Sequence, residues 1–117
     1  MNRFALIIAI LFTVLIIYLG VAEAEKITIT NFQINDKLVH MLIYVLFYFL
    51  WHNPFAYFFK DNSLVYLFVF TLIFSSSIEI AQKYLTLTRS AEFMDIFFNI
   101  IGIVLAHTYF KLKKRNI

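Results

Sequence analysis

Cysteine is absent from this 117-residue chain, and proline, glycine and charge are scarce, with one Pro, two Gly and 15% charged residues. Without cysteine the chain has no disulfide, thiol nucleophile or thiolate metal site. Hydrophobic residues make up 62% of the chain and aromatic residues 20%, whereas an ordinary soluble domain is about half apolar and about a quarter charged. So short a chain cannot hide this much apolar surface in one aqueous core. The composition therefore excludes a soluble enzyme domain, a disordered tail and a disulfide scaffold, and it favours a small integral membrane protein.

Charged side chains are missing from long stretches, and this pattern predicts four transmembrane helices, at about residues 4–22, 36–53, 63–82 and 92–110. Residues 4–22 contain no Asp, Glu, Lys, Arg or His and come close to the roughly 20 apolar residues that cross a bilayer as a helix. The apolar part of the second span, residues 38–51, is long enough only if Asp36 and Lys37 lie at the interface. The connections are too short for a second domain. We therefore expect one domain, residues 1–117, with an all-α fold: an integral membrane bundle of four transmembrane helices.

The first apolar stretch also has features of a signal peptide. Arg3 precedes it, and Ala22-Glu23-Ala24 follows it like a small-residue cleavage site. The stretch is longer than the usual apolar region of a signal peptide, which favours a retained helix.

The distribution of cations predicts the orientation of the bundle. With the N-terminus in the cytoplasm, four spans return the C-terminus there, and the cytoplasmic side then holds six cations and one acid: Arg3, Lys60, Lys111, Lys113, Lys114 and Arg115 against Asp61. Loops on the cytoplasmic side of membrane proteins are enriched in Lys and Arg. The basic charge thus reflects topology, so we expect membrane lipids as partners and no nucleic acid.

Polar side chains converge at the opposite, outer side of the predicted bundle. They come from three separate stretches: Asp36, Lys37 and His40; Ser75–Ser77, Glu79 and Gln82; and Arg89, Glu92, Asp95 and Asn99. Ionisable groups inside membrane spans are costly, face the bundle interior and usually mark function. This convergence at one depth is the main functional signal in the sequence.

The spacing of these residues places them on shared helix faces. Asp36 and His40 are four residues apart, as are Asp95 and Asn99, and residues at this spacing are neighbours on a helix. The second and fourth spans both run from outside to inside, so both present the positive ends of their helix dipoles to this site. Lys37 adds a full positive charge there, as does Arg89. The site therefore favours an anion.

Four motifs in this order resemble those of the VanZ-like membrane proteins: DKLVH at 36–40, EIAQ at 79–82, TRSAEFMD at 88–95 and DIFFNIIG at 95–102. The resemblance implies a four-helix protein of the bacterial plasma membrane, from a family associated with teicoplanin (glycopeptide) resistance and with no established biochemical activity. It also implies the following family-type positions: Asp36, Lys37, His40, Glu79, Gln82, Arg89, Asp95, Asn99 and Gly102.

Two functions remain open for this site. In the first, it binds an anionic cell-envelope molecule, a lipid-linked phosphate or a peptide carboxylate, with Lys37 and Arg89 holding the anion. Glu79, Asp95 and Asn99 then orient the cations.

In the second, the chain is an intramembrane enzyme acting on an envelope lipid or peptidoglycan precursor. His40 polarised by Asp36 serves as the base, and Glu79 and Asp95 as acid or metal ligands. No nucleophile motif or phosphate-cradling loop is present, so binding is favoured, and neither a metal nor a cofactor is predicted.

Several polar or small residues also have a purely architectural interpretation. The whole polar cluster can be a hydrogen-bond network that sets the order of the helices. Gly102 and Ala106 form a small-xxx-small pair typical of close helix packing. Serine hydroxyls within a helix commonly bond to its backbone, which we expect for residues 75–77. His52 and His107 are expected at the cytoplasmic interface.

Overall fold

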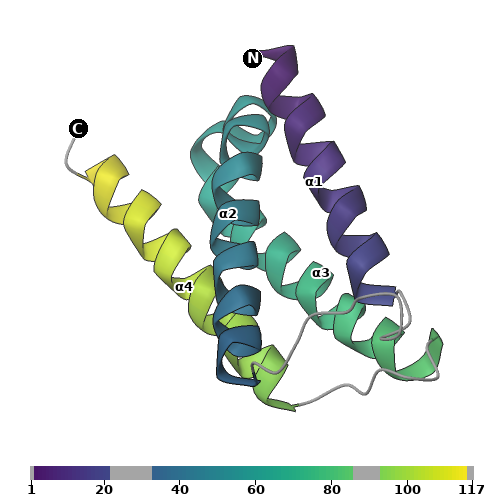
Figure 1. Cartoon of the computed structure of the whole chain (residues 1–117). Coiled ribbons are helices and arrows are strands. Elements are labelled where there is room, and N and C mark those ends of the chain that lie inside the picture. The colour runs from purple at the N-terminus through teal and green to yellow at the C-terminus, as the bar shows by residue number, and fades with distance from the viewer. Residues whose placement is uncertain (1, 22–32, 86–92, 116–117) are drawn as a thin grey trace.

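The computed structural model describes residues 2–21, 33–85 and 93–115, and every regular element within them is helical. The elements are α1 (Arg3–Val21), α2 (Gln33–Phe59), the 3-10 turn η2 (Lys60–Asn62), α3 (Ser63–Leu85) and α4 (Phe93–Arg115) (Figure 1). At 1.5 Å per residue the four α-helices are about 28 to 40 Å long, close to or above the roughly 30 Å of a bilayer's hydrocarbon core. The prediction of an all-α bundle is confirmed.

The described helices form three continuous stretches that are long and apolar enough to cross a membrane: Arg3–Gly20, Lys37–Tyr84 and Met94–Arg115. The sequence predicted four separate spans, but the middle stretch has 48 residues and contains both α2 and α3. As one straight helix it would be about 72 Å long, whereas the longest dimension of the molecule is 46 Å. The middle stretch therefore folds back on itself at η2, as Figure 1 shows.

The helices run alternately up and down, so the bundle has two distinct ends (Figure 1). The start of α1, the turn η2 and the end of α4 lie at one end, which we call the N/C end. The ends of α1 and α3 and the starts of α2 and α4 lie at the other, which we call the far end. This arrangement brings the predicted polar stretches of α2, α3 and α4 to the far end.

The chain reverses between α2 and α3 without a glycine. Lys60 adopts a left-handed backbone conformation, with φ of 51°, which costs a non-glycine residue about 1–2 kcal/mol. The sequence suggested an end to the second span before Pro54, yet α2 continues through it to Phe59. Proline removes one backbone hydrogen bond inside a helix, and helices in membranes tolerate this loss when their neighbours pack around it. Pro54 is fully buried, in accord with that explanation.

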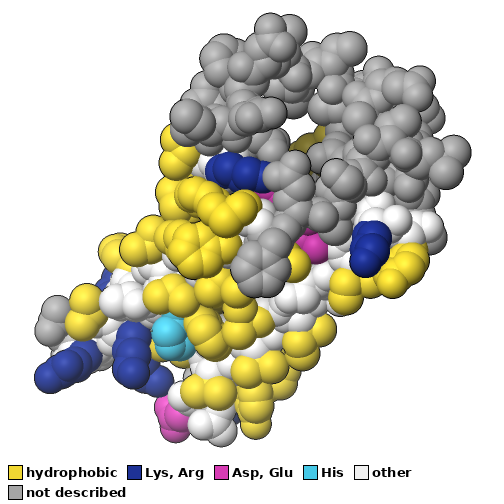
Figure 2. Space-filling view, turned by 90° about the horizontal axis from the view of Figure 1, so that it is seen from below, with side chains coloured by type: hydrophobic (Ala, Val, Ile, Leu, Met, Phe, Trp, Pro, Cys, Tyr) yellow, Lys and Arg dark blue, Asp and Glu magenta, His cyan; other side chains and the backbone are white. Residues whose placement is uncertain are grey.

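Apolar side chains cover the outside of the bundle. Large hydrophobic residues are exposed on all four α-helices, for example Leu11, Leu42, Ile73 and Leu105, each more than half exposed. Figure 2 shows hydrophobic side chains over much of the described part of one face, with charged side chains gathered towards its ends. Soluble monomers rarely expose such continuous apolar surface, so this surface is suited to lipid.

Aromatic side chains pack the seam between α2 and α3. Phe47 of α2 stacks on Phe74 of α3 with ring centroids 4.9 Å apart and 7° between the ring planes. Further along the same seam, Phe55 of α2 packs on Phe70 of α3 with ring centroids 5.2 Å apart. Trp51 lies between these contacts and donates from Nε1 to Thr13 Oγ1 of α1 at 2.8 Å. The seam thus holds α2 to α3 by ring packing, while α1 is joined to α2 by a hydrogen bond.

Gly102 brings α4 into direct contact with the backbone of α2. A Cβ atom at this position would collide with the carbonyl oxygen of Met41 and lie 3.1 Å from its carbonyl carbon. Ala106, one turn further along α4, is 1% exposed. The prediction of close helix packing at this small-residue pair is confirmed.

We predict that Gly102→Ala destabilises the folded chain by about 1–3 kcal/mol, because the added methyl overpacks against backbone that cannot rotate away. Thermal unfolding of the purified protein in detergent measures this effect. Val104→Ala on the same helix, at a position 42% exposed, is the matched control and should change stability by less than about 0.5 kcal/mol. Equal stability of Gly102→Ala and the unsubstituted chain would show that α4 does not approach α2 so closely.

Candidate functional site: a buried polar cluster

The polar cluster consists of Lys37 and His40 from α2, Glu79 and Gln82 from α3, and Asp95 and Asn99 from α4. Each residue lies within about two turns of the far end of its helix. Glu79 and Asn99 are 1% exposed, Gln82 is 3% exposed and Asp95 is 6% exposed. Four polar side chains are therefore buried in one region of a molecule whose outer surface is largely apolar.

Lys37 and Asp95 form an ion pair that joins α2 to α4. The ammonium donates to Asp95 Oδ1, and the two side chains are 18% and 8% exposed, respectively. Asp95 lies in the first turn of α4, where a negative charge interacts favourably with the helix dipole. The cation is thus the more accessible partner, with the carboxylate behind it.

Glu79 is the meeting point of three helices. Its Oε1 lies 4.0 Å from His40 Nδ1 of α2 and accepts a hydrogen bond from Asn99 Nδ2 of α4 at 3.5 Å. The His40 side chain is 15% exposed, whereas that of Glu79 is 2% exposed. This second pair repeats the arrangement of the first, with a nitrogen-bearing side chain outermost and a carboxylate behind it.

Asn99 also contributes an acceptor. Its Oδ1 is buried and has no hydrogen-bond donor among the residues that the structure describes. Leaving a buried polar atom without a partner costs about 1–3 kcal/mol. The placement of oxygen and nitrogen in an Asn side chain follows its hydrogen bonds, and here the donation to Glu79 directs the oxygen away from that carboxylate.

The end of α1 packs against α3 beside the cluster. A Cβ atom on Gly20 would meet Ile78 Cγ2 at 2.7 Å and lie 3.9 Å from Gln82 Nε2. The absence of a side chain at Gly20 therefore lets α1 approach the last turns of α3. Gln82 is thus a predicted site residue that lies close to the end of α1.

Six of the eight predicted site residues can be placed, and the structure brings them together as described above. Arg89 lies outside the described residues, as does the predicted site neighbour Glu92, and the side chain of Asp36 does too. The expected polarisation of His40 by Asp36 therefore stays a prediction, and the carboxylate that the structure places close to His40 is that of Glu79. The convergence of the polar stretches predicted that His40 and Glu79 share one cluster at this end of the bundle, and their 4.0 Å separation agrees with that prediction. Spacing within a helix did not show which carboxylate lies closest to His40.

Two of the serines for which the architectural interpretation predicted bonds to the helix backbone make them. Ser75 Oγ donates to Leu72 O and Ser77 Oγ to Ile73 O, so both serve their own helix. His107, expected only at the interface, shares a hydrogen bond of 2.6 Å through its Nδ1 with the hydroxyl of Tyr48, which is fully buried. This α2–α4 bond was missed because its two residues are 59 positions apart in the sequence and lie on different helices.

The described carboxylates do not gather into a metal centre. Within residues 2–21, 33–85 and 93–115, no three His, Asp or Glu side chains approach closely enough to hold a metal ion together. Asp95 is engaged with Lys37, and Glu79 with His40 and Asn99. The described part of the cluster therefore consists of two groups, and in each group one carboxylate lies next to nitrogen-bearing side chains.

Comparisons of the chain with protein-family models, with curated proteins and with solved structures give no match. The resemblance to VanZ-like proteins stays a prediction that rests on the four motifs.

The contact between His40 and Glu79 can be tested by crosslinking, because the chain has no native cysteine. We predict that cysteines at 40 and 79 are joined by a short bifunctional thiol reagent in native membranes, since the two side chains face each other. Cysteines at Val39 and Ile80, which are 49% and 58% exposed, are the matched control and should stay unlinked. Failure of the 40–79 pair to link, with both thiols reactive towards a monofunctional reagent, would contradict the cluster.

Proposed function

We propose that the chain is a multi-pass VanZ-like protein of the bacterial plasma membrane, with four spans and both termini in the cytoplasm. The four motifs support the family. The lengths of α2 and α3, 27 and 23 residues, support a separate crossing by each, and the exposed residues of η2 support a return between them. The cations at the N/C end support its cytoplasmic location.

Reporter fusions test this topology. Fusions after Asp61 and after Ile117 should read cytoplasmic, and a fusion near Thr28 should read external, because an even number of crossings keeps both termini on one side. An external signal from the fusion after Ile117 would contradict the topology and would move the polar cluster to the cytoplasmic side.

We further propose that the polar cluster binds the phosphate or carboxylate of an anionic envelope molecule at the outer leaflet. The observation that carries this proposal is the layering of the cluster, in which Lys37 and His40 are partly exposed and Asp95 and Glu79 lie buried behind them. Buried carboxylates hold the nitrogen-bearing groups in place, and those groups are the ones an incoming anion reaches first. Binding then requires the Lys37 ammonium to exchange its bond to Asp95 for a bond to a ligand oxygen, or to bind both oxygens at once.

The helix ends add to the attraction. Both α2 and α4 begin at this end of the bundle (Figure 1), and the backbone N–H groups of a helix N-terminus favour a negative charge. Asn99 Oδ1 offers a buried acceptor in the same cluster, suited to a hydroxyl or amide N–H of the same ligand. An envelope molecule that carries an anion next to a hydrogen-bond donor fits this combination.

An intramembrane enzyme is the second candidate, and the 4.0 Å separation of His40 and Glu79 favours it. A histidine next to a buried carboxylate is a common arrangement for a general base. In this alternative the same envelope molecule is a substrate, so product formation separates the two functions. A purely structural network is the third candidate, in which the cluster serves only the packing of α2, α3 and α4.

Removing both charges of the Lys37–Asp95 pair distinguishes a ligand-binding role of the pair from a purely structural one. Lys37→Gln alone should destabilise the chain by about 3 kcal/mol, because it leaves the buried Asp95 without its cation. Adding Asp95→Asn should restore stability, since two neutral amides can bond to each other. We predict that this double variant nevertheless binds a polyprenyl phosphate at least about tenfold more weakly, as it lacks the cation that holds the anion.

Native mass spectrometry of the full chain in neutral detergent measures binding, and thermal unfolding measures stability. The uncharged polyprenol is the matched ligand control, and a peptide carboxylate is compared with its amide in the same way. Unchanged binding by the stable double variant would contradict the anion site. If the unsubstituted chain retains neither anion, the cluster is structural, and turnover of either probe would establish the enzyme.

A further inference from the structure

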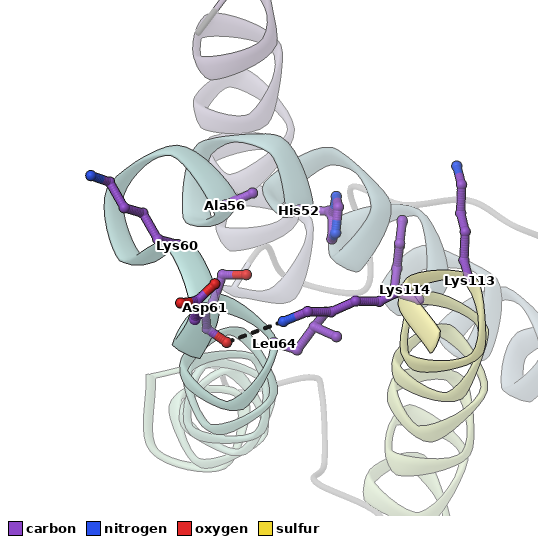
Figure 3. A pocket seen from close by; sticks show the side chains of 9 residues that line it. His52, Ala56, Lys60, Asp61, Leu64, Lys113 and Lys114 are labelled. Atoms are coloured by element: carbon purple, nitrogen blue, oxygen red, sulfur yellow. Dashed lines mark hydrogen bonds between the residues drawn. The ribbon is translucent and has the colours of Figure 1, made fainter. Parts of the chain in front are cut away.

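A second candidate binding site lies at the N/C end, far from the polar cluster. It is a cleft of about 270 Å³ between the α2–α3 reversal and the last turns of α4. Figure 3 shows that its walls come from two parts of the chain, residues 52–64 and residues 110–114, which are far apart in the sequence. None of its lining residues belongs to the site proposed above.

The floor of the cleft, which is the buried part of its lining, is mostly apolar. Phe110 and Leu64 line it and are 8% and 9% exposed, next to Ser63, which is 6% exposed. Ala56 also lines the cleft. The ring of His52 stacks on Phe110 with centroids 3.9 Å apart and planes 7° apart. This stacking holds the last turns of α4 against α2 and so fixes the position of Phe110 in the cleft.

The lining of the cleft carries an excess of positive charge. Lys60, Lys113 and Lys114 line it, with Asp61 as the acid among its lining residues, which leaves a net charge of +2 (three cations less one carboxylate). Lys114 reaches across the cleft, and its Nζ donates to the backbone carbonyl oxygen of Asp61 at 3.2 Å (Figure 3). A main-chain carbonyl positions the ammonium without neutralising it, so the charge of Lys114 stays available to an anion.

A cationic rim over an apolar floor matches an amphiphilic anion. An inorganic phosphate would use the lysines alone, whereas a phospholipid places its phosphate at the rim and its glycerol and first acyl carbons on the floor. Basic pockets between membrane helices on the cytoplasmic side are recurrent sites for anionic head groups. The cleft lies at the end of the bundle where such head groups would be found if the N/C end is cytoplasmic.

We infer that this cleft is a binding site for the head group of an anionic phospholipid of the inner leaflet. Lys113 and Lys114 bind the phosphate, and Leu64 and Phe110 contact the glycerol and the first acyl carbons. The inference rests on the membrane topology proposed above, but it is independent of any ligand at the polar cluster. It differs from a general attraction of the basic C-terminal tail to the membrane because it depends on particular lysines and on an open cleft.

The test compares two double variants that remove the same charge from the same helix. Lys113→Ala with Lys114→Ala removes two lining cations, whereas Lys111→Ala with Arg115→Ala removes two exposed cations outside the cleft. A third variant, Ala56→Phe, keeps every charge and fills the cleft. Retention of phosphatidylglycerol by the full-length chain is measured by native mass spectrometry in neutral detergent, with phosphatidylcholine as the matched lipid.

We expect the Lys113/Lys114 variant and Ala56→Phe each to lower the affinity for phosphatidylglycerol by about tenfold or more. The Lys111/Arg115 variant should stay within about twofold of the unsubstituted chain. Thermal unfolding confirms that each variant is folded before its binding is compared.

Three results would overturn the inference. An equal loss of phosphatidylglycerol binding in the Lys113/Lys114 and Lys111/Arg115 variants would show nonspecific attraction by the tail. Undiminished binding by folded Ala56→Phe would show that the cleft is not used. Displacement of the lipid by equimolar inorganic phosphate would identify free phosphate as the ligand. The Lys37→Gln/Asp95→Asn variant should keep its phosphatidylglycerol, so failure of this site and failure of the polar cluster can be distinguished.

Discussion

The contact between Gly102 and the backbone of Met41 is the constraint on which the rest of the structure depends. It lets α4 approach α2 more closely than any side chain would allow, and it sets which face of α4 is turned inward. Asp95 lies seven residues earlier and Asn99 three residues earlier, on the same stripe of the helix. The close approach therefore also directs Asp95 towards Lys37 and Asn99 towards Glu79.

Desolvation explains why the polar side chains are paired as they are. A charge in an apolar interior is stable only with a partner and further hydrogen bonds. Here Asp95 has Lys37, and Glu79 has His40 and Asn99, so each carboxylate is met by donors from another helix. The same pairs that lower the cost of burial also fix the relative positions of three helices, which is why structural and ligand-binding roles overlap in this cluster.

Much of this arrangement could be predicted from the sequence because a membrane restricts the alternatives. Long uncharged stretches can only be helices there, and an up-and-down bundle then brings the starts of α2 and α4 and the end of α3 together. What local spacing could not give was the choice of partners between helices, such as Glu79 for His40 or Tyr48 for His107. The continuation of α2 through Pro54 was missed for a related reason, since the neighbours that compensate the lost hydrogen bond lie elsewhere in the chain.

Two polar contacts between α2 and α4 lie on either side of Gly102, with Lys37–Asp95 towards one end and Tyr48–His107 towards the other. A lengthwise slip of α4 by one turn, about 5.4 Å, would break both at once, so sliding is strongly disfavoured. The stacking of His52 on Phe110 holds α4 to α2 beyond Tyr48–His107. A movement of α4 at Asp95 therefore does not have to reach Lys113 and Lys114 at the opposite end of the bundle.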